Sequence, residues 1–406
     1  MASHDACVRL NVAIGAAGSV AELIDLTRRE HATLNLVNCV TSLNRLAKMA
    51  HGDEIDGVSL EHITARAAEC FGASQSGQTR HVSGTLWACA KLRLAPPELL
   101  AAVLRVASGM SPAWFKPAEL SMAVWAVGKL GLGSETGGPA LVARLLPSAF
   151  ARARSLDPQG LSNIATGLAA LPVDADSTRR LLIATRDRLH EFGPQEVANT
   201  LSAFARLGAA LDGCEGFAQS AAVAIERSLA AFSAQQLANS AWAVAKLVEG
   251  AGEAEARGCL DFWRLFASAV TARAGEFRPA ELSMTSWAAA QAAASSPGGE
   301  RAAAWASALG HASQRLAPSM NGQQLATIAS AIVKLGCWDK AALKAIGGAA
   351  RKRMREFNPQ DLDNLASAFA RLDEWSAPKL VSAIAKAGVA TIDRGGFPPR
   401  NLSNLL

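Results

Sequence analysis

Cationic side chains recur about every 40 residues in this 406-residue chain, at equivalent places in a repeated string. This first basic row consists of Arg45, Lys91, Lys129, Arg206, Lys246, Lys334 and Arg371. One Lys or Arg per repeat on a common face can contact the phosphates of a nucleic acid. A cation in the last turn of a helix is also favoured by the helix dipole, without any ligand. The sequence leaves both interpretations open.

Polar and aromatic residues precede the cation position at constant spacing. Asn stands seven residues before it, at Asn38, Asn163, Asn199, Asn239 and Asn364. Four residues before it stand Thr166, Ser202, Ser330 and Ser367, or else Trp87, Trp125, Trp242 and Trp287. Amides and hydroxyls can hydrogen-bond base edges, and Trp can stack on a base. The alternative interpretations are an Asn ladder between repeats and Trp packing between repeats.

A second basic row lies nine or ten residues before the first Leu or Val that follows the Pro-Gln pair of each repeated string. We expect Arg152, Arg188, Arg273 and Arg353 of this row to be further phosphate contacts; Arg227 and Arg315 belong to it too. Two cationic stripes along one molecule suggest a nucleic-acid partner more strongly than the net charge of +5 does. The helix dipole offers a ligand-free explanation here as well.

No arrangement of residues in the sequence is typical of catalysis. The seven His and seven Cys are scattered, without HExxH, CxxC or other metal-ligand spacing. The glycines of GLGSETGG lack the spacing of a nucleotide-binding loop. We therefore expect no enzyme activity, no cofactor and no small-molecule substrate, and a chain that acts by binding.

The repeated string itself predicts the elements that carry these residues. FSAQQLANSAWAVAKL, FNPQDLDNLASAFARL, FGPQEVANTLSAFARL and FKPAELSMAVWAVGKL are its clearest copies. We number the first Leu or Val after the Pro-Gln pair position 0, so that the Asn, Trp or Ser, and cation fall at positions +2, +5 and +9. The expected anchors at position 0 are Leu36, Val82, Leu120, Leu161, Val197, Leu237, Leu282, Leu325 and Leu362. A truncated tenth repeat spans 397–406, and we expect the natural protein to continue beyond it.

Each string opens like a helix. A capping residue such as Ser233 or Asn321 is followed by Pro or a small residue and, two positions later, by Glu or Gln. Positions 0, +4, +7 and +8 are apolar and share one helical face. We call this segment helix A, and the second amphipathic segment that follows it helix B. Since one pair cannot bury its apolar faces alone, the pairs must stack. The sequence predicts one all-α, right-handed α-solenoid over residues 1–406, made of about nine helix-turn-helix repeats of about 40 residues, with helix A on the concave side.

The strings PQxLANxxWAxAKL and PQDLxNLASAFARL resemble the octotricopeptide repeat, and are similar to the repeats that precede the RAP domain in organellar RNA-metabolism proteins. The resemblance covers residues 34–406. It implies binding of single-stranded RNA in a chloroplast or mitochondrion, where such proteins stabilise, process or promote translation of transcripts. The alternative that the sequence leaves open is a protein-binding scaffold or a structural subunit of a large organellar assembly such as a ribosome. We expect no membrane span, because no apolar run is long enough.

Overall fold

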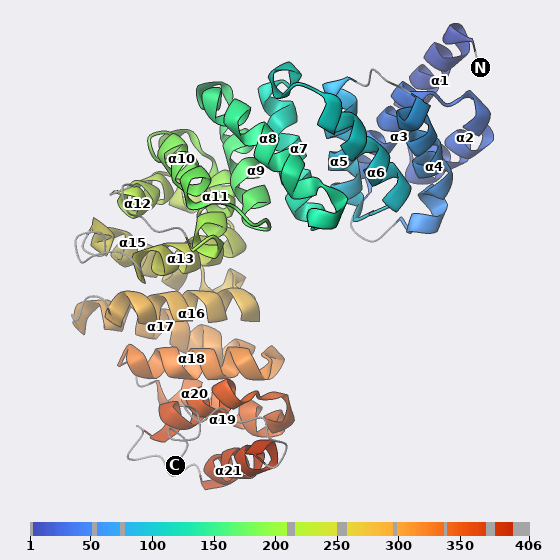
Figure 1. Ribbon diagram of the computed structural model, residues 1–406. Coiled ribbons are helices and arrows are strands. Elements are labelled where there is room, and N and C mark those ends of the chain that lie inside the picture. Colours follow the sequence, from blue (N-terminus) through green and yellow to red (C-terminus); the bar gives the residue numbers. More distant parts are fainter. Residues whose placement is uncertain are drawn as a thin grey trace. The chain divides into compact units, whose positions relative to one another are not determined.

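The computed structural model describes residues 3–50, 55–73, 78–208, 216–249, 258–294, 299–336, 339–370 and 378–392. Within these ranges every regular element is an α-helix or a short 3-10 helix, which confirms the all-α prediction (Figure 1). The helices pack neighbour to neighbour, as a helical solenoid requires. They cluster into two compact units, Met1–Thr185 and Arg186–Leu406, which we call unit 1 and unit 2.

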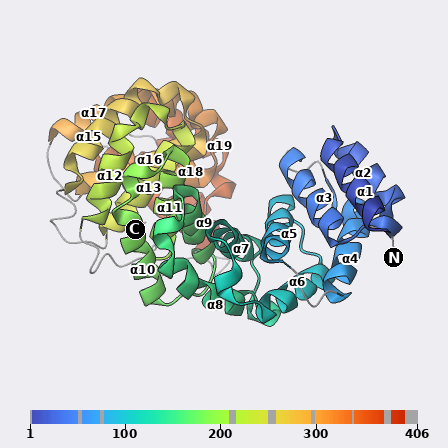
Figure 2. The same cartoon turned by 90° about the horizontal axis from the view of Figure 1, so that it is seen from above.

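Unit 1 contains five helix pairs. Its helices are α1 (His4–Ala16), α2 (Val20–Arg29), α3 (Leu36–Met49), α4 (Gly57–Ala73), α5 (Thr79–Leu92), α6 (Pro97–Gly109), α7 (Pro117–Leu130), α8 (Gly138–Ala151), α9 (Pro158–Leu168) and α10 (Ala175–Arg186). The A-type helices α3, α5, α7 and α9 pack each on the next, and the B-type helices α4, α6 and α8 do the same less extensively. Figure 2 shows the two rows on opposite sides of the unit. The pair α1 and α2 precedes the first expected repeat.

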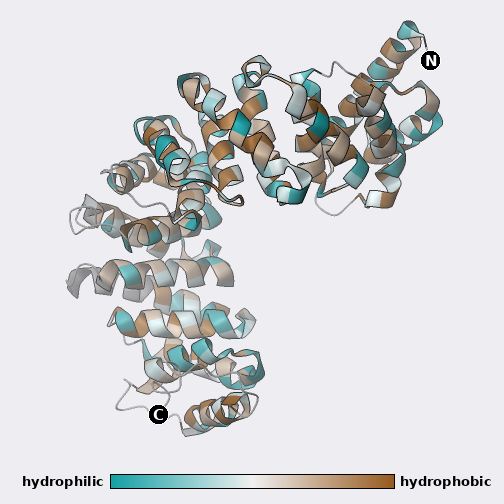
Figure 3. Cartoon of the chain, in the orientation of Figure 1, coloured by the Kyte–Doolittle hydropathy of each residue, from teal (hydrophilic) through white to brown (hydrophobic). Residues whose placement is uncertain are grey.

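Unit 2 continues the same alternation. Its helices are α11 (Pro194–Arg206), α12 (Phe217–Arg227), α13 (Ala234–Glu249), α15 (Leu260–Ala272), α16 (Pro279–Ala294), α17 (Gly299–Leu316), α18 (Gly322–Lys334), α19 (Lys340–Lys352), α20 (Pro359–Ala370) and α21 (Pro378–Ile392). The A-type row runs α11, α13, α16, α18, α20, and the B-type row runs α12, α15, α17, α19, α21. Apolar and polar faces alternate around single helices, as amphipathic stacking requires (Figure 3).

The helices open where the sequence predicts. Asp157 accepts a hydrogen bond from the Gly160 amide at 2.7 Å, and Asn321 forms a reciprocal capping box with Gln324. A proline is the first residue of α7, α9, α11, α16 and α20. Capping side chains and N-terminal prolines satisfy or remove amides that a helix leaves unpaired, so these openings need no ligand to explain them.

The anchors form the core between successive A helices. Eight of the nine expected anchors, from Val82 to Leu362, are at most 1% exposed. The small residue at position +6 is also buried, at Ala88, Ala126, Ala203, Ala243, Ala288, Ala331 and Ala368. Gly167 takes that place in α9, where a Cβ would lie 2.5 Å from the Val124 carbonyl oxygen of α7. The backbones therefore approach as closely as the small residues predict.

The ninth anchor, Leu36, was placed three residues too early. The N-cap of α3 is Asn35, and in the other A helices position 0 follows the N-cap residue by four. Cys39 therefore occupies position 0 and is fully buried, whereas Leu36 is half-buried. The shift puts Lys48, and not Arg45, at position +9. The string around Asn35 lacks both the proline and the Glu or Gln that mark the clearest openings, so the position of its anchor was less well determined.

Two predictions fall on residues that the structure does not describe: Arg371 and the tenth repeat at 397–406. None of the described helices combines the length and the apolar character needed to span a bilayer.

Candidate nucleic-acid interface

The A-type helices of unit 1 share a groove of about 630 Å³. It crosses α3, α5, α7 and α9, and its lining includes Lys48, Arg80, Trp87 and Asn163. No B-type helix contributes to its lining. The groove thus combines cations, an indole ring and an amide on the face that helix A was expected to present.

Cations at position +9, in the corrected register of α3, lie open on unit 1. Lys48, Lys91 and Lys129 are exposed, at position +9 of α3, α5 and α7. The ammonium of Lys91 lies 5.9 Å from the ring centroid of Trp125 on the following A helix. A cation over an indole face is attracted by the ring quadrupole and remains able to meet an anion.

Unit 2 repeats this geometry. Arg206 and Lys334 are exposed, and Lys246 is half-buried. The Lys246 ammonium lies 4.8 Å from the Trp287 ring centroid and 2.7 Å from Glu249. In both units, therefore, a position +9 cation lies over the position +5 indole of the next A helix.

The four tryptophans at position +5 are partly exposed. Trp87, Trp125, Trp242 and Trp287 are all of intermediate exposure, so each packs one part of its ring and presents another. A fully buried row would leave no ring surface for a base. Each ring instead packs partly against the protein and leaves part of its surface open, so both packing between repeats and stacking on a base are compatible with this geometry.

Arg45 does not belong to the exposed row. Its Nη2 donates to the Ala17 carbonyl at 2.6 Å, and its buried Nε has no partner among the described residues. Arg45 therefore serves the C-terminal end of α1, since it sits one turn before the true position +9.

The predicted base contacts divide into buried and accessible residues. Asn38 is 1% exposed and donates to the Cys7 carbonyl at 2.9 Å, and Ser202 is 5% exposed. Both face the protein interior, so we leave them out of the interface. The other candidates are of intermediate exposure: Asn163, Asn199, Asn239, Asn364, Thr166, Ser330 and Ser367.

Local bonds occupy part of the hydrogen-bonding capacity of these accessible candidates. Thr166 donates to the Ser162 carbonyl at 2.8 Å, and Asn199 accepts from Gln195 at 2.9 Å. Asn364 accepts from Gln360 and Ser367 donates to Asp363. Each Asn that accepts in this way keeps its amide N–H groups for a further acceptor.

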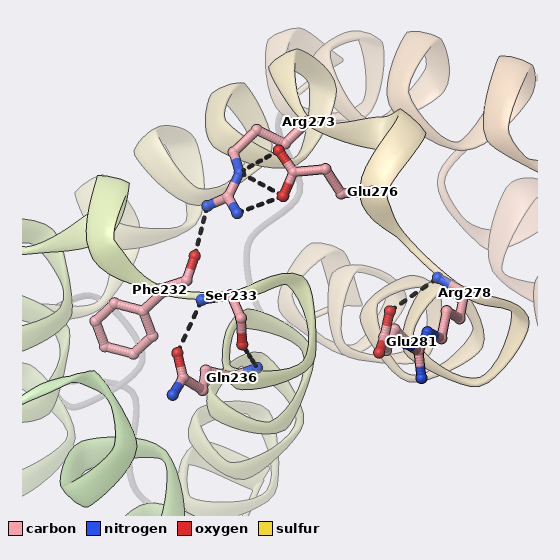
Figure 4. Close-up of polar contacts among 7 residues, drawn as sticks. All are labelled: Phe232, Ser233, Gln236, Arg273, Glu276, Arg278 and Glu281. Atoms are coloured by element: carbon pink, nitrogen blue, oxygen red, sulfur yellow. Dashed lines mark hydrogen bonds and ion pairs between the residues drawn. The ribbon is translucent and has the colours of Figure 1, made fainter.

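The second basic row points into the protein. Arg152 donates to the Phe115 carbonyl at 2.6 Å and to the Pro112 carbonyl at 3.1 Å. Arg273 donates to the Phe232 carbonyl at 2.7 Å, as Figure 4 shows, and Arg353 donates to the Pro318 carbonyl at 2.7 Å. In each case the arginine follows helix B and the acceptor lies just before helix A of the same pair. We call this contact the arginine clamp.

Acidic residues fix the clamp. Arg188 pairs with Glu191 at 2.6 Å, Arg273 pairs with Glu276, and Arg353 lies 3.8 Å from Glu356. Hydrogen bonds from the arginines lower the pKa of the Glu191 and Glu276 carboxyls below its ordinary value. We leave Arg152, Arg188, Arg273 and Arg353 out of the interface because these contacts give them a structural role.

A sequence signal for the clamp exists. The strings RLHEF, RAGEF and RMREF place Glu three residues after Arg and directly before the Phe of the helix opening. Arg66, which lies outside the second basic row, and Arg315, which belongs to it, make the same contact, to the Leu34 and Phe277 carbonyls. A Glu directly before the Phe of a helix opening thus marks a structural arginine, although Arg152 and Arg315 make the contact without one.

Among the described residues no His, Cys, Asp and Glu side chains gather in a group that could hold a metal ion. No model of a known protein family matches the chain, and no curated protein matches it either. The exposed row on the A helices is therefore the feature on which a functional assignment must rest.

Proposed function

We propose that this chain is a right-handed α-solenoid of about nine 40-residue repeats that binds single-stranded RNA along its A helices. The proposed site comprises the position +9 cations Lys48, Lys91, Lys129, Arg206, Lys246 and Lys334, with the position +5 tryptophans beside them. By its resemblance to octotricopeptide repeats, the chain acts on transcripts in a chloroplast or mitochondrion, in stabilisation, processing or translation.

One observation carries the proposal: at two places a position +9 lysine lies over the partly exposed indole of the next A helix. The pairs are Lys91 with Trp125 in unit 1 and Lys246 with Trp287 in unit 2. Single-stranded RNA alternates phosphates with unpaired bases, which bind cations and stack on aromatic rings respectively.

The test is binding of a random single-stranded RNA pool at about 50 mM and about 200 mM salt. The variant changes Lys91, Lys129, Arg206 and Lys334 to Ala. The matched control removes the same charge from exposed cations of the B helices: Arg105, Lys344, Lys379 and Lys386.

Each lost phosphate contact reduces the slope of log K against log salt by about 0.7, so the A-helix variant should lose about 3 in slope and the control much less. If the two variants lost the same amount of slope, the loss would be explained by net charge alone and not by contacts on the A helices. An unchanged A-helix variant, or tight salt-insensitive binding of a protein partner, would instead favour a scaffold.

A further inference from the structure

Two cysteines lie close together in the first helix A and the first helix B of the repeat array. Cys39 lies in α3 and Cys70 in α4, which pack against each other, and the two side chains share a hydrogen bond. Both are free thiols. The two residues are 31 positions apart and meet only because the helices fold back on each other.

The surroundings of the two sulfur atoms differ. Cys39 is fully buried, whereas Cys70 is partly exposed at the surface of α4. Arg66 stands one helical turn before Cys70 and is held there by Glu69 at 2.7 Å and by the Leu34 carbonyl at 3.0 Å. A small reagent can therefore reach Cys70 but not Cys39, and a fixed cation accompanies the reachable sulfur.

The protonation of the pair follows from this arrangement. The hydrogen bond from Cys39 and the positive charge of Arg66 lower the pKa of the Cys70 thiol to about 7. The same hydrogen bond and, after it, burial raise the pKa of the Cys39 thiol, so Cys39 keeps its proton. The thiolate is the reactive form of a cysteine, which makes Cys70 the nucleophile of the pair.

We propose that Cys39 and Cys70 form a thiol–disulfide exchange site that reacts with low-molecular-weight disulfides of the glutathione type. The Cys70 thiolate attacks one sulfur of the disulfide RSSR, forming a mixed disulfide and releasing RS⁻. Cys39 then attacks the Cys70 sulfur, loses its proton and releases the second RS⁻. The balance is two protein thiols plus RSSR giving one protein disulfide plus two RSH.

The product ties helix A to helix B within one pair. Since α3 and α4 already pack against each other, the disulfide joins two neighbouring helices. A cross-link between positions 39 and 70 restricts the unfolded chain, so the oxidised protein should unfold at a higher temperature. This site does not depend on RNA binding by the chain.

The test treats the full chain with glutathione disulfide and maps cysteines after trypsin digestion under non-reducing conditions. Trypsin releases Cys39 in residues 30–45 and Cys70 in residues 67–80. We expect these two peptides to become linked, with the loss of two hydrogens, and to separate on reduction. Cys39→Ala should retain glutathione on 67–80, and Cys70→Ala should leave 30–45 unmodified.

The unmutated protein provides a measurement independent of variant folding. Iodoacetamide should alkylate peptide 67–80 faster than peptide 30–45, with a rate that rises as pH passes through about 7. Failure of the two peptides to link, or alkylation of Cys70 no faster than Cys39, would overturn the proposal.

Discussion

Replacing Arg273 with Ala removes one arginine clamp from unit 2. Its Nη1 donates to the Phe232 carbonyl at 2.7 Å, and its other nitrogens bind the Glu276 carboxylate (Figure 4). The Arg273 side chain is 23% exposed, so the bond to the carbonyl is largely shielded from water. The substitution leaves that carbonyl without its charged donor, directly before α13.

The size of the effect follows from the type of bond. A hydrogen bond from a charged donor contributes about 1.5–3 kcal/mol, and the ion pair adds little because Glu276 is 52% exposed and screened by solvent. We expect Arg273→Ala to lower the free energy of unfolding of unit 2 by about 1.5–3 kcal/mol. Glu276→Gln should cost clearly less, and Arg273→Lys should rescue little because Lys lacks the planar fork.

Urea unfolding followed by tryptophan fluorescence measures this loss. Repeat proteins can lose two-state cooperativity, so hydrogen exchange of the amides around Phe232 supplies a local measurement. The matched control is Arg206→Ala, an exposed cation whose loss should change stability by less than about 0.5 kcal/mol.

The two variants should differ in the opposite way in RNA affinity. At temperatures where both remain folded, Arg206→Ala should reduce RNA affinity and Arg273→Ala should leave it unchanged. If Arg273→Ala weakened RNA binding and left stability intact, the structural role of the second basic row would be refuted.

Three further substitutions test other features. Gly128→Ala should destabilise unit 1, although Ala has a helix propensity better than that of Gly by about 1 kcal/mol, because the added methyl would lie 2.7 Å from the Gly167 Cα and closer still to its carbonyl oxygen. Gly348→Ala, with open space around the residue, should stabilise unit 2. If both substitutions changed the unfolding temperature in the same direction, the close approach of the backbones at Gly128 would be contradicted. Trp87→Leu should weaken RNA binding by about 1–3 kcal/mol in a filter assay, whereas Trp114→Leu, at a 67% exposed residue off the A helices, should not. Burial raises the pKa of the Asp361 carboxyl, so ionisation of this group disfavours the folded state and stability falls as pH rises through that pKa. Asp361→Asn should therefore be more stable than the parent at pH 7, as measured by urea unfolding. If the difference in stability persisted in acid, ionisation of Asp361 would be ruled out as its cause.

The sequence was sufficient for features that local residues determine. The openings at Asp157, Asn321 and Pro194 were readable because a capping side chain or a proline lies within four residues of an apolar anchor. The burial of Leu237 and its equivalents followed from the 3.6-residue period. At Asn35, where the opening has neither proline nor Glu or Gln, the same reasoning placed the anchor three residues early.

Contacts between distant segments were not readable in the same way. Arg152 reaches the Phe115 carbonyl across 37 residues, and a backbone acceptor has no residue type that could identify it. The second basic row therefore looked like a phosphate row until the helices were placed. In the sequence, Glu191, Glu276 and Glu356 stand three residues after Arg188, Arg273 and Arg353 and directly before a Phe, and that signal was overlooked. Arg152 has no such Glu, so nothing in its own string identified its role.

The positions of donor and acceptor in each arginine clamp determine how such an array unfolds. The donor lies on or directly after helix B and the acceptor directly before helix A of the same pair, as Arg315 and Phe277 illustrate. A pair that detaches from either end of a stretch therefore takes both halves of its clamp with it and leaves the clamps of its neighbours intact. The clamps thus make each pair a unit, and a stack held in this manner should lose whole pairs from its two ends alike.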